Sequence, residues 1–197
     1  MNEIQPISLT NKALNNQEFT PLEKIILGLL YFYNDKVDAN RLHKMVFLAS
    51  LDFEEARDML EPKPSIYKDI FYDENIDEAI ESLKFDGFIE GDSTFLLSTK
   101  GKELTPFLLS DKEKDILEEV VDLFKNTTDD EILAIFYFKL YDQIKILKPL
   151  PRIFKDRKKL AISLYQKEKI SIEAASEIAG IDLSKFMKLL KKKGILS

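Results

Sequence analysis

The residues best suited to a chemical role are lysines near the C-terminus. Lys185, Lys188 and Lys192 recur at spacings of three and four residues, which places them on one face of a helix, beside Ser184 and Lys191. Ammonium groups gathered on one surface can neutralise the phosphates of a nucleic acid. A second cluster, Arg157, Lys158 and Lys159, lies at the start of a helix expected at residues 156–168. The predicted DNA-binding residues are Ser184, Lys185, Lys188, Lys191, Lys192, Arg157, Lys158 and Lys159.

Charge is distributed unevenly along the chain. Residues 152–197 contain 12 Lys and Arg against 5 Asp and Glu, a net charge of +7. The whole chain contains 29 and 35, so residues 1–151 contain 17 and 30, a net charge of −13. This asymmetry favours a nucleic-acid contact at one end and a different task at the other. Because acidic side chains repel phosphates, we expect the acidic part to dimerise or to bind protein.

Three short helices are expected to position the lysines, at residues 156–168, 171–179 and 182–193. Ser171 suits the start of the second helix, since its hydroxyl can accept a backbone N–H. Gly180 suits the turn after that helix, because glycine adopts a left-handed backbone without strain. The order predicts a helix-turn-helix, with residues 182–193 as the helix that reads DNA.

The third of these helices has a predicted buried face and a predicted cap. Leu183, Phe186 and Leu190 recur at helical spacing and are expected to face the core. Asp182 can cap the first turn. A competing explanation exists for the lysines at residues 191–193, since cations near a helix C-terminus interact favourably with its dipole. The mid-helix lysines, Lys185 and Lys188, have no such explanation, and the alternative for them is an ordinary solvated face of the helix.

The run LAISLYQKEKISIEAASEIAGIDLSKFMKLLKKKGI carries a recognisable pattern. It resembles a small uncharacterised helix-turn-helix family of archaea and bacteria, whose members are often antitoxin partners of PIN-domain ribonucleases. The resemblance implies an antitoxin-like role and a toxin as a partner. Glu168 stands where the pattern has glycine, Ser176 where it has alanine and Asp182 where it has serine. The matching positions are Ala161, Leu164, Tyr165, Lys169, Ile170, Ser171, Ala174, Ala175, Ala179, Gly180 and Ile181.

The order of elements in residues 20–108 is that of a winged helix. Thr20 and Glu23 indicate a capping box at the start of a helix. Further helices are expected near residues 38–49 and 73–86, and FIE-GDST-FLLS predicts a hairpin after them. The runs RLHKMVFLASL and IDEAIESLKFDGFIEGDSTFLLSTKGKEL resemble archaeal winged-helix proteins and proteins with a Panacea-like antitoxin domain. This resemblance implies a winged-helix fold.

The remaining residues divide the chain into four expected segments: an N-terminal arm at 1–19, the winged helix at 20–108, a helical dimerisation segment at 109–148 and the helix-turn-helix at 149–197. In the third segment, ILAIFYFKLY is apolar nearly all round, as in a helix buried in a core or in a partner. Its aromatic residues indicate packing rather than a platform for single-stranded nucleic acid. The predicted dimer or partner interface is Ile132, Ile135, Phe136, Phe138 and Tyr141.

Composition limits the chemistry that the chain can perform. The chain has no cysteine, which excludes disulfides, zinc–thiolate sites and cysteine nucleophiles. The single histidine, His43, is expected to be structural rather than a ligand. We expect no enzyme activity, metal or cofactor. The N-terminus lacks the apolar stretch of a signal peptide, and the longest apolar run, at residues 25–33, is too short to span a bilayer. The sequence therefore predicts a cytoplasmic protein without membrane contact.

These observations predict a mainly α protein that combines a winged helix with a small β-hairpin, a helical middle segment and a C-terminal helix-turn-helix. We expect a DNA-binding transcriptional regulator of antitoxin-like type, which binds double-stranded DNA as a homodimer. The alternative is an adaptor or antitoxin that neutralises a protein partner through its acidic region without touching DNA.

Overall fold

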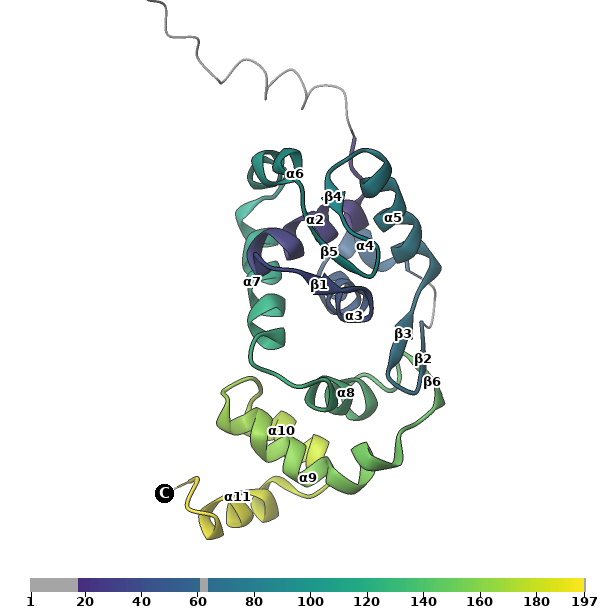
Figure 1. Ribbon diagram of the computed structural model, residues 1–197. Coiled ribbons are helices and arrows are strands. Elements are labelled where there is room, and N and C mark those ends of the chain that lie inside the picture. The colour runs from purple at the N-terminus through teal and green to yellow at the C-terminus, as the bar shows by residue number, and fades with distance from the viewer. Residues whose placement is uncertain (1–17, 61–63, 197) are drawn as a thin grey trace, which may run out of the picture. The chain divides into compact units, whose positions relative to one another are not determined.

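A computed structural model describes residues 18–60 and 64–196, and it is mainly helical with two small sheets (Figure 1). All but the last two residues of the expected arm, 1–19, lie outside the described residues. The contacts divide the chain into two compact units. Unit 1 is Met1–Leu60 with Glu74–Val121, and unit 2 is Glu61–Asp73 with Asp122–Ser197.

Unit 1 consists of helices around a three-stranded sheet. Its helices are α2 (Pro21–Tyr33), α3 (Ala39–Ser50), α4 (Glu54–Arg57), α5 (Glu74–Phe85), α6 (Thr99–Leu104), the 3-10 helix η1 (Thr105–Phe107) and all but the end of α7 (Asp111–Phe124). Its strands are β1 (Val37–Asp38), β4 (Ile89–Glu90) and β5 (Thr94–Leu97). They form an antiparallel sheet in the order β1-β5-β4, so the hairpin predicted after residue 87 is confirmed.

The start of α2 shows why the local sequence determines this element. The Thr20 hydroxyl accepts the Glu23 backbone N–H at 3.2 Å, and the Glu23 carboxylate accepts the Thr20 backbone N–H at 2.8 Å. The predicted capping box is therefore confirmed. The Ser82 hydroxyl of α5 donates to the same carboxylate at 2.7 Å. Further along α2, a Cβ on Gly28 would lie 2.4 Å from Leu117 Cδ1, so glycine permits the close approach of α7.

Unit 2 contains α8 (Asp129–Phe138), α9 (Pro151–Gln166), α10 (Ile172–Ala179) and α11 (Leu183–Lys192). Its strands are β2 (Ser65–Tyr67), β3 (Ile70–Tyr72) and β6 (Lys145–Lys148). They form a sheet in the order β3-β2-β6, in which β2 is antiparallel to β3 and parallel to β6. The hairpin β2–β3 thus comes from a segment between α4 and α5, yet it pairs with a strand far along the chain (Figure 1).

The apolar helix α8 belongs to the core of unit 2. Ile132, Ile135 and Phe136 are 1%, 7% and 0% exposed, so these three side chains pack inside the unit and cannot contribute to a dimer or partner interface. The physical reason is the hairpin, whose Phe71 ring lies 5.7 Å from the Phe136 ring. Of the five residues expected at the interface, Phe138 is half-buried and Tyr141 is 60% exposed.

The contact units also divide the expected middle segment, residues 109–148. Most of α7 packs in unit 1, whereas α8 and β6 pack in unit 2 with the three C-terminal helices. Unit 2 therefore includes far more than the expected helix-turn-helix of residues 149–197.

Candidate nucleic-acid interface

The turn between α10 and α11 is built from local capping chemistry. The Ser171 hydroxyl accepts the Ala174 backbone N–H at 3.2 Å and starts α10, as predicted. Gly180 ends α10 in a left-handed conformation with φ of 68°, which confirms the predicted turn. Asp182 precedes α11 but makes no side-chain capping hydrogen bond. Its carboxylate instead pairs with Lys185 at 3.0 Å, one turn further on.

Most of α11 faces solvent. Of its ten residues, only Phe186 and Leu190 are buried. Leu183, expected in the core, is 36% exposed, so that expectation is wrong. With about 3.6 residues per turn, the side opposite the two buried residues bears only polar groups. These exposed groups are Ser184, Lys185, Lys188, Lys191 and Lys192.

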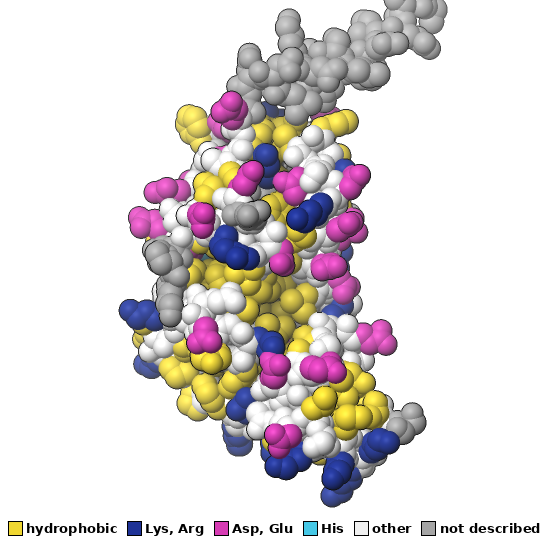
Figure 2. Space-filling view, turned by 180° about the vertical axis from the view of Figure 1, so that it is seen from behind, with side chains coloured by type: hydrophobic (Ala, Val, Ile, Leu, Met, Phe, Trp, Pro, Cys, Tyr) yellow, Lys and Arg dark blue, Asp and Glu magenta, His cyan; other side chains and the backbone are white. Residues whose placement is uncertain are grey.

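The space-filling view shows the same distribution over the surface of unit 2. Lys and Arg side chains gather at the lower end of this view, where the chain reaches its C-terminus, and a patch of hydrophobic side chains lies beside them (Figure 2). Helix α11 contains no Asp or Glu that could neutralise its lysines. This end of unit 2 therefore presents a positive surface to an approaching polyanion.

The 12 basic residues of 152–197 fall into two groups. Five of them bind acceptors inside unit 2: Arg152, Arg157, Lys167, Lys169 and Lys185. The other seven are exposed and form no ion pair within the described part of the chain: Lys155, Lys158, Lys159, Lys188, Lys191, Lys192 and Lys193. Of the eight residues predicted to contact DNA, seven are therefore exposed: Ser184 and six lysines. One of these lysines, Lys185, pairs with Asp182 at the surface.

Arg157, the eighth predicted residue, has a structural position. Its Nε donates to the Ile178 carbonyl at 2.7 Å and its Nη2 donates to the Glu177 carbonyl at 3.1 Å. These carbonyls lie in the last turn of α10, where a cation interacts favourably with the end of the helix. The guanidinium also lies 4.0 Å from the centre of the Phe138 ring, and burial lowers the pKa of Arg157. Arg157 thus fixes the turn before α11 and is not free to bind a phosphate.

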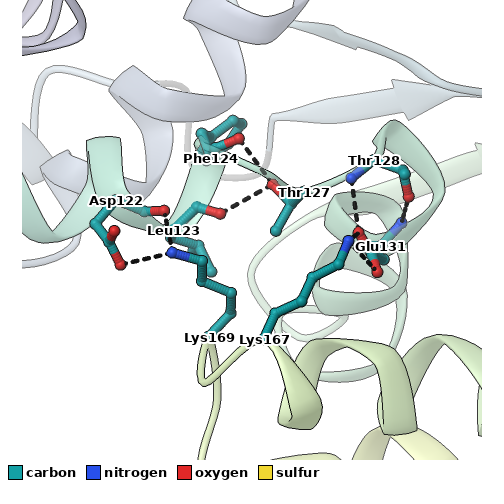
Figure 3. Close-up of polar contacts among 8 residues, drawn as sticks. All are labelled: Asp122, Leu123, Phe124, Thr127, Thr128, Glu131, Lys167 and Lys169. Carbon is teal, nitrogen blue, oxygen red and sulfur yellow. Dashed lines mark hydrogen bonds and ion pairs between the residues drawn. The ribbon is translucent and has the colours of Figure 1, made fainter.

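Two lysines brace the turn between α9 and α10, as Figure 3 shows. Lys167 donates to Glu131 at 2.8 Å, and Lys169 donates at 2.8 Å to both the carboxylate and the backbone carbonyl of Asp122. Glu131 is only 2% exposed and also accepts the Thr128 backbone N–H at 2.7 Å. These ion pairs join the turn after α9 to the end of α7 and the start of α8.

The ionisation of Glu131 depends on these contacts. Burial alone would raise the pKa of Glu131, but hydrogen bonds from Lys167, Ser163 and the Thr128 backbone outweigh it. The net effect lowers the pKa below the ordinary value, so the carboxylate stays charged opposite Lys167. Neither pairing could be read from the sequence, because Lys167 and Lys169 look like ordinary solvated residues until α8 is folded against α9.

Residues 152–197 match the model of an uncharacterised protein family, UPF0175. The matched region covers α10, α11 and all of α9 except its first residue, and it includes every residue predicted to contact DNA. No curated protein and no solved structure matches the chain. The resemblance of residues 20–108 to winged-helix and Panacea-like proteins stays a prediction.

Glu168 lies in the part of the chain that matches UPF0175, and its backbone is left-handed with φ of 58°. This conformation is disfavoured for a residue with a Cβ. Glycine, which has no Cβ, would adopt it without strain. The departure of this chain from the pattern therefore introduces strain in the turn that Lys167 and Lys169 brace.

The single histidine of the chain, His43, lies inside unit 1. His43 is 4% exposed, and its Nε2 lies 3.0 Å from the Asp77 carboxylate of α5. Among the described residues, no group of His, Asp or Glu could hold a metal ion. In the same part of the chain, no helix has the length and apolar character needed to cross a membrane.

Proposed function

We propose that the protein is a DNA-binding regulator of antitoxin-like type, with α11 as its reading helix. The observation that carries this proposal is the outer side of α11, where Lys188, Lys191 and Lys192 are exposed and have no acidic partner within the described residues. The match of residues 152–197 to UPF0175 is compatible with an antitoxin-like role. The proposed activity needs no catalysis and no cofactor, and it takes place in the cytoplasm.

In the proposed mechanism, α10 and α11 form the helix-turn-helix and α11 enters the major groove. This groove is about 12 Å wide and admits a helix. The lysines bind phosphates and set the register, while Ser184 and Lys185, near the start of α11, reach base edges. A homodimer would place two copies of α11 in half-sites about 34 Å apart, one helical turn of DNA.

For unit 1 we propose a winged helix that contacts protein rather than DNA. The sheet order β1-β5-β4, with β1 between α2 and α3 in sequence, supports this fold. In a winged helix that reads DNA, α5 would lie against phosphates. However, α5 and the β4–β5 hairpin bear acidic groups that would repel them, at Glu74, Asp77, Glu78, Glu81, Glu90 and Asp92.

The test is a titration of double-stranded DNA at several salt concentrations. The variant Lys188/Lys191/Lys192→Ala removes three exposed charges from α11. Its control, Lys36/Lys102/Lys112→Ala, removes three exposed charges from unit 1 and gives the same net charge. Each lost phosphate contact should reduce the slope of log K against log salt by roughly 0.9, so the α11 variant should lose up to about 2.7.

Two results would count against DNA binding. Absence of binding at low salt would refute the proposal outright. Equal slopes for the two triple variants would show that the protein attracts DNA through its general charge rather than through α11. Light scattering on the wild type tests the dimer separately, and a monomer at high concentration would refute it.

A second candidate function follows from the acidic surface of α5. A protein that masks a basic partner, such as a ribonuclease, needs an acidic contact surface. Under this alternative, the charge-reversed variant Glu78/Glu81→Lys should lose the partner, while the α11 triple variant should keep it. If the protein is instead a DNA-binding regulator, the α11 triple variant should lose DNA binding and Glu78/Glu81→Lys should keep it.

A further inference from the structure

The sheet β3-β2-β6 has one buried face and one exposed face. Ile66 and Phe71 pair across β2 and β3 and are 0% and 2% exposed. Since side chains alternate along a strand, the neighbours of these two residues point to the opposite face. There Tyr67, Ile70 and Tyr72 are 48%, 56% and 48% exposed. Large apolar side chains gathered at a solvent-exposed face indicate a binding surface.

The strand register arranges this outer face in two rows. In the first row, Tyr72 lies opposite Ser65, which lies opposite Lys145. In the second row, Ile70 lies opposite Tyr67, which lies opposite Lys148. Each row therefore ends in an exposed lysine on β6. The two tyrosines occupy diagonal positions on neighbouring strands, where residues are about 7–8 Å apart.

Cations surround the more central of the two tyrosines. The Nζ atoms of Lys68 and Lys148 each lie 5.8 Å from the centre of the Tyr67 ring. Residues 64–72 and 143–150 together contain three lysines and one acidic residue, Asp69 in the hairpin turn. The outer face thus combines flat aromatic rings with an excess of positive charge, which suits a ligand that has both rings and anionic groups.

We propose that the outer face of sheet β3-β2-β6 binds single-stranded nucleic acid. Successive bases stack on Tyr67 and Tyr72, and the backbone phosphates lie along Lys145 and Lys148. Aromatic platforms bordered by basic side chains bind unpaired strands in this way, because every base has a face that can stack. Double-stranded DNA cannot use these tyrosines, since its bases are already stacked and paired.

A second copy of the chain is a poorer occupant of this face. Two copies packed through the same surface would gather Lys145 and Lys148 of both copies in one interface, and like charges gathered in an interface are unfavourable. The sheet and α11 lie at different ends of unit 2 (Figure 1), so the inference does not depend on the proposed function of α11.

The experiment measures binding of labelled single strands of about 12 nucleotides to the full chain by fluorescence anisotropy. RNA and DNA of the same sequence are the two arms, and they distinguish which strand is the natural ligand class. Tyr67→Leu keeps the apolar bulk of the side chain but removes the ring, whereas Tyr67→Phe keeps the ring. Tyr31→Leu, at a side chain in unit 1 that is 37% exposed, is the matched control.

We expect Tyr67→Leu to weaken binding by about 10-fold or more, the usual effect of losing one stacked base. Tyr67→Phe and Tyr31→Leu should bind like the wild type. Lys145/Lys148→Ala should reduce the salt slope by roughly 0.7 for each lost phosphate contact, the single-strand value. An abasic strand should bind weakly and should not distinguish Tyr67→Leu from the wild type. The α11 triple variant should retain single-strand binding, so the two proposals fail independently.

Three outcomes would overturn the inference. The first is absence of single-strand binding at about 50 mM salt, where electrostatic contacts are strong. The second is equal affinity of the wild type and Tyr67→Leu, which would mean simple adsorption to lysines. The third is self-association of the wild type that Tyr67→Leu abolishes, which would identify the face as a protein interface. Circular dichroism of each variant establishes that the fold is intact.

Discussion

Replacement of Gly180 by alanine tests whether Arg157 holds the turn before α11. An alanine there has two costs. The left-handed backbone, with φ of 68°, costs a residue with a Cβ about 1–2 kcal/mol. In addition, the new Cβ would lie 2.5 Å from Arg157 Cζ, so the guanidinium would have to move. If the guanidinium moves, it loses its hydrogen bonds to the carbonyls of α10, and a hydrogen bond to a charged group contributes about 1.5–3 kcal/mol. Because Arg157 is only half-buried, water would replace part of these hydrogen bonds and reduce the loss. We expect a total destabilisation of about 2–4 kcal/mol.

A double-mutant cycle separates the two costs. In an Arg157→Ala background the guanidinium is gone, so Gly180→Ala should cost only the backbone strain of about 1–2 kcal/mol. The coupling between the two positions should therefore be about 1–2 kcal/mol, well above the error for residues that do not interact. Gly87→Ala is the control, because its φ is +72° and no heavy atom beyond its chain neighbours lies within 4 Å of the place that a Cβ would occupy.

The assay is urea denaturation followed by circular dichroism, combined with hydrogen exchange of the α10 amides. Hydrogen exchange is needed because two compact units can unfold separately, which would blur a single transition. Additive costs for Gly180→Ala and Arg157→Ala would refute the reasoning. Arg157 would then not occupy the space beside Gly180, and its assignment as a structural residue would fall.

Three further predictions concern the same unit. Glu168→Gly should raise the free energy of unfolding by up to about 1 kcal/mol, because relief of left-handed strain exceeds the added chain entropy; urea denaturation measures this, and a loss of stability would contradict it. Asp182→Asn should tighten double-stranded DNA binding several-fold, since it frees Lys185 and removes a negative charge, and the salt titration checks it. The contribution of Glu131 to stability is full above its ordinary pKa of about 4.5 and is lost as the pH falls through its lowered folded pKa. Glu131→Gln should therefore flatten the acid limb of a stability–pH curve, and an unchanged limb would refute this role.

Elements set by local chemistry can be predicted from the sequence. The start of α2 is indicated by Thr20 and Glu23, and the end of α10 is indicated by Gly180, so each has a signal in its own local sequence. The amphipathic spacing of α11 likewise predicts the side on which its lysines lie. Each of these predictions rests on contacts within a few residues of the chain, where side-chain type and spacing decide the geometry.

The elements that escape prediction depend on distant contacts. Strands β2 and β3 have three residues each, too few to show a clear alternation, and β2 pairs with β6 some 80 residues later. The apolar sequence of α8 predicts that the helix is buried, but it does not indicate whether the same chain or a partner covers it. Without the hairpin in view, the pattern assigns Phe136 to an interface instead of to the core beside Phe71, and that assignment is wrong.

Charge counting alone also misjudges the candidate site. The net charge of residues 152–197 treats Arg157, Lys167 and Lys169 as equal to the lysines of α11, yet these three already bind acceptors inside unit 2. Moving them to a phosphate would break the contacts that hold α9, α10 and α8 together. A polyanion meets the exposed lysines that form no ion pair within the described residues, to which α9 and α11 contribute three each, and of these two helices only α11 contains no acidic residue. The internal contacts of Arg157, Lys167 and Lys169 therefore hold in place the helices that carry the exposed lysines.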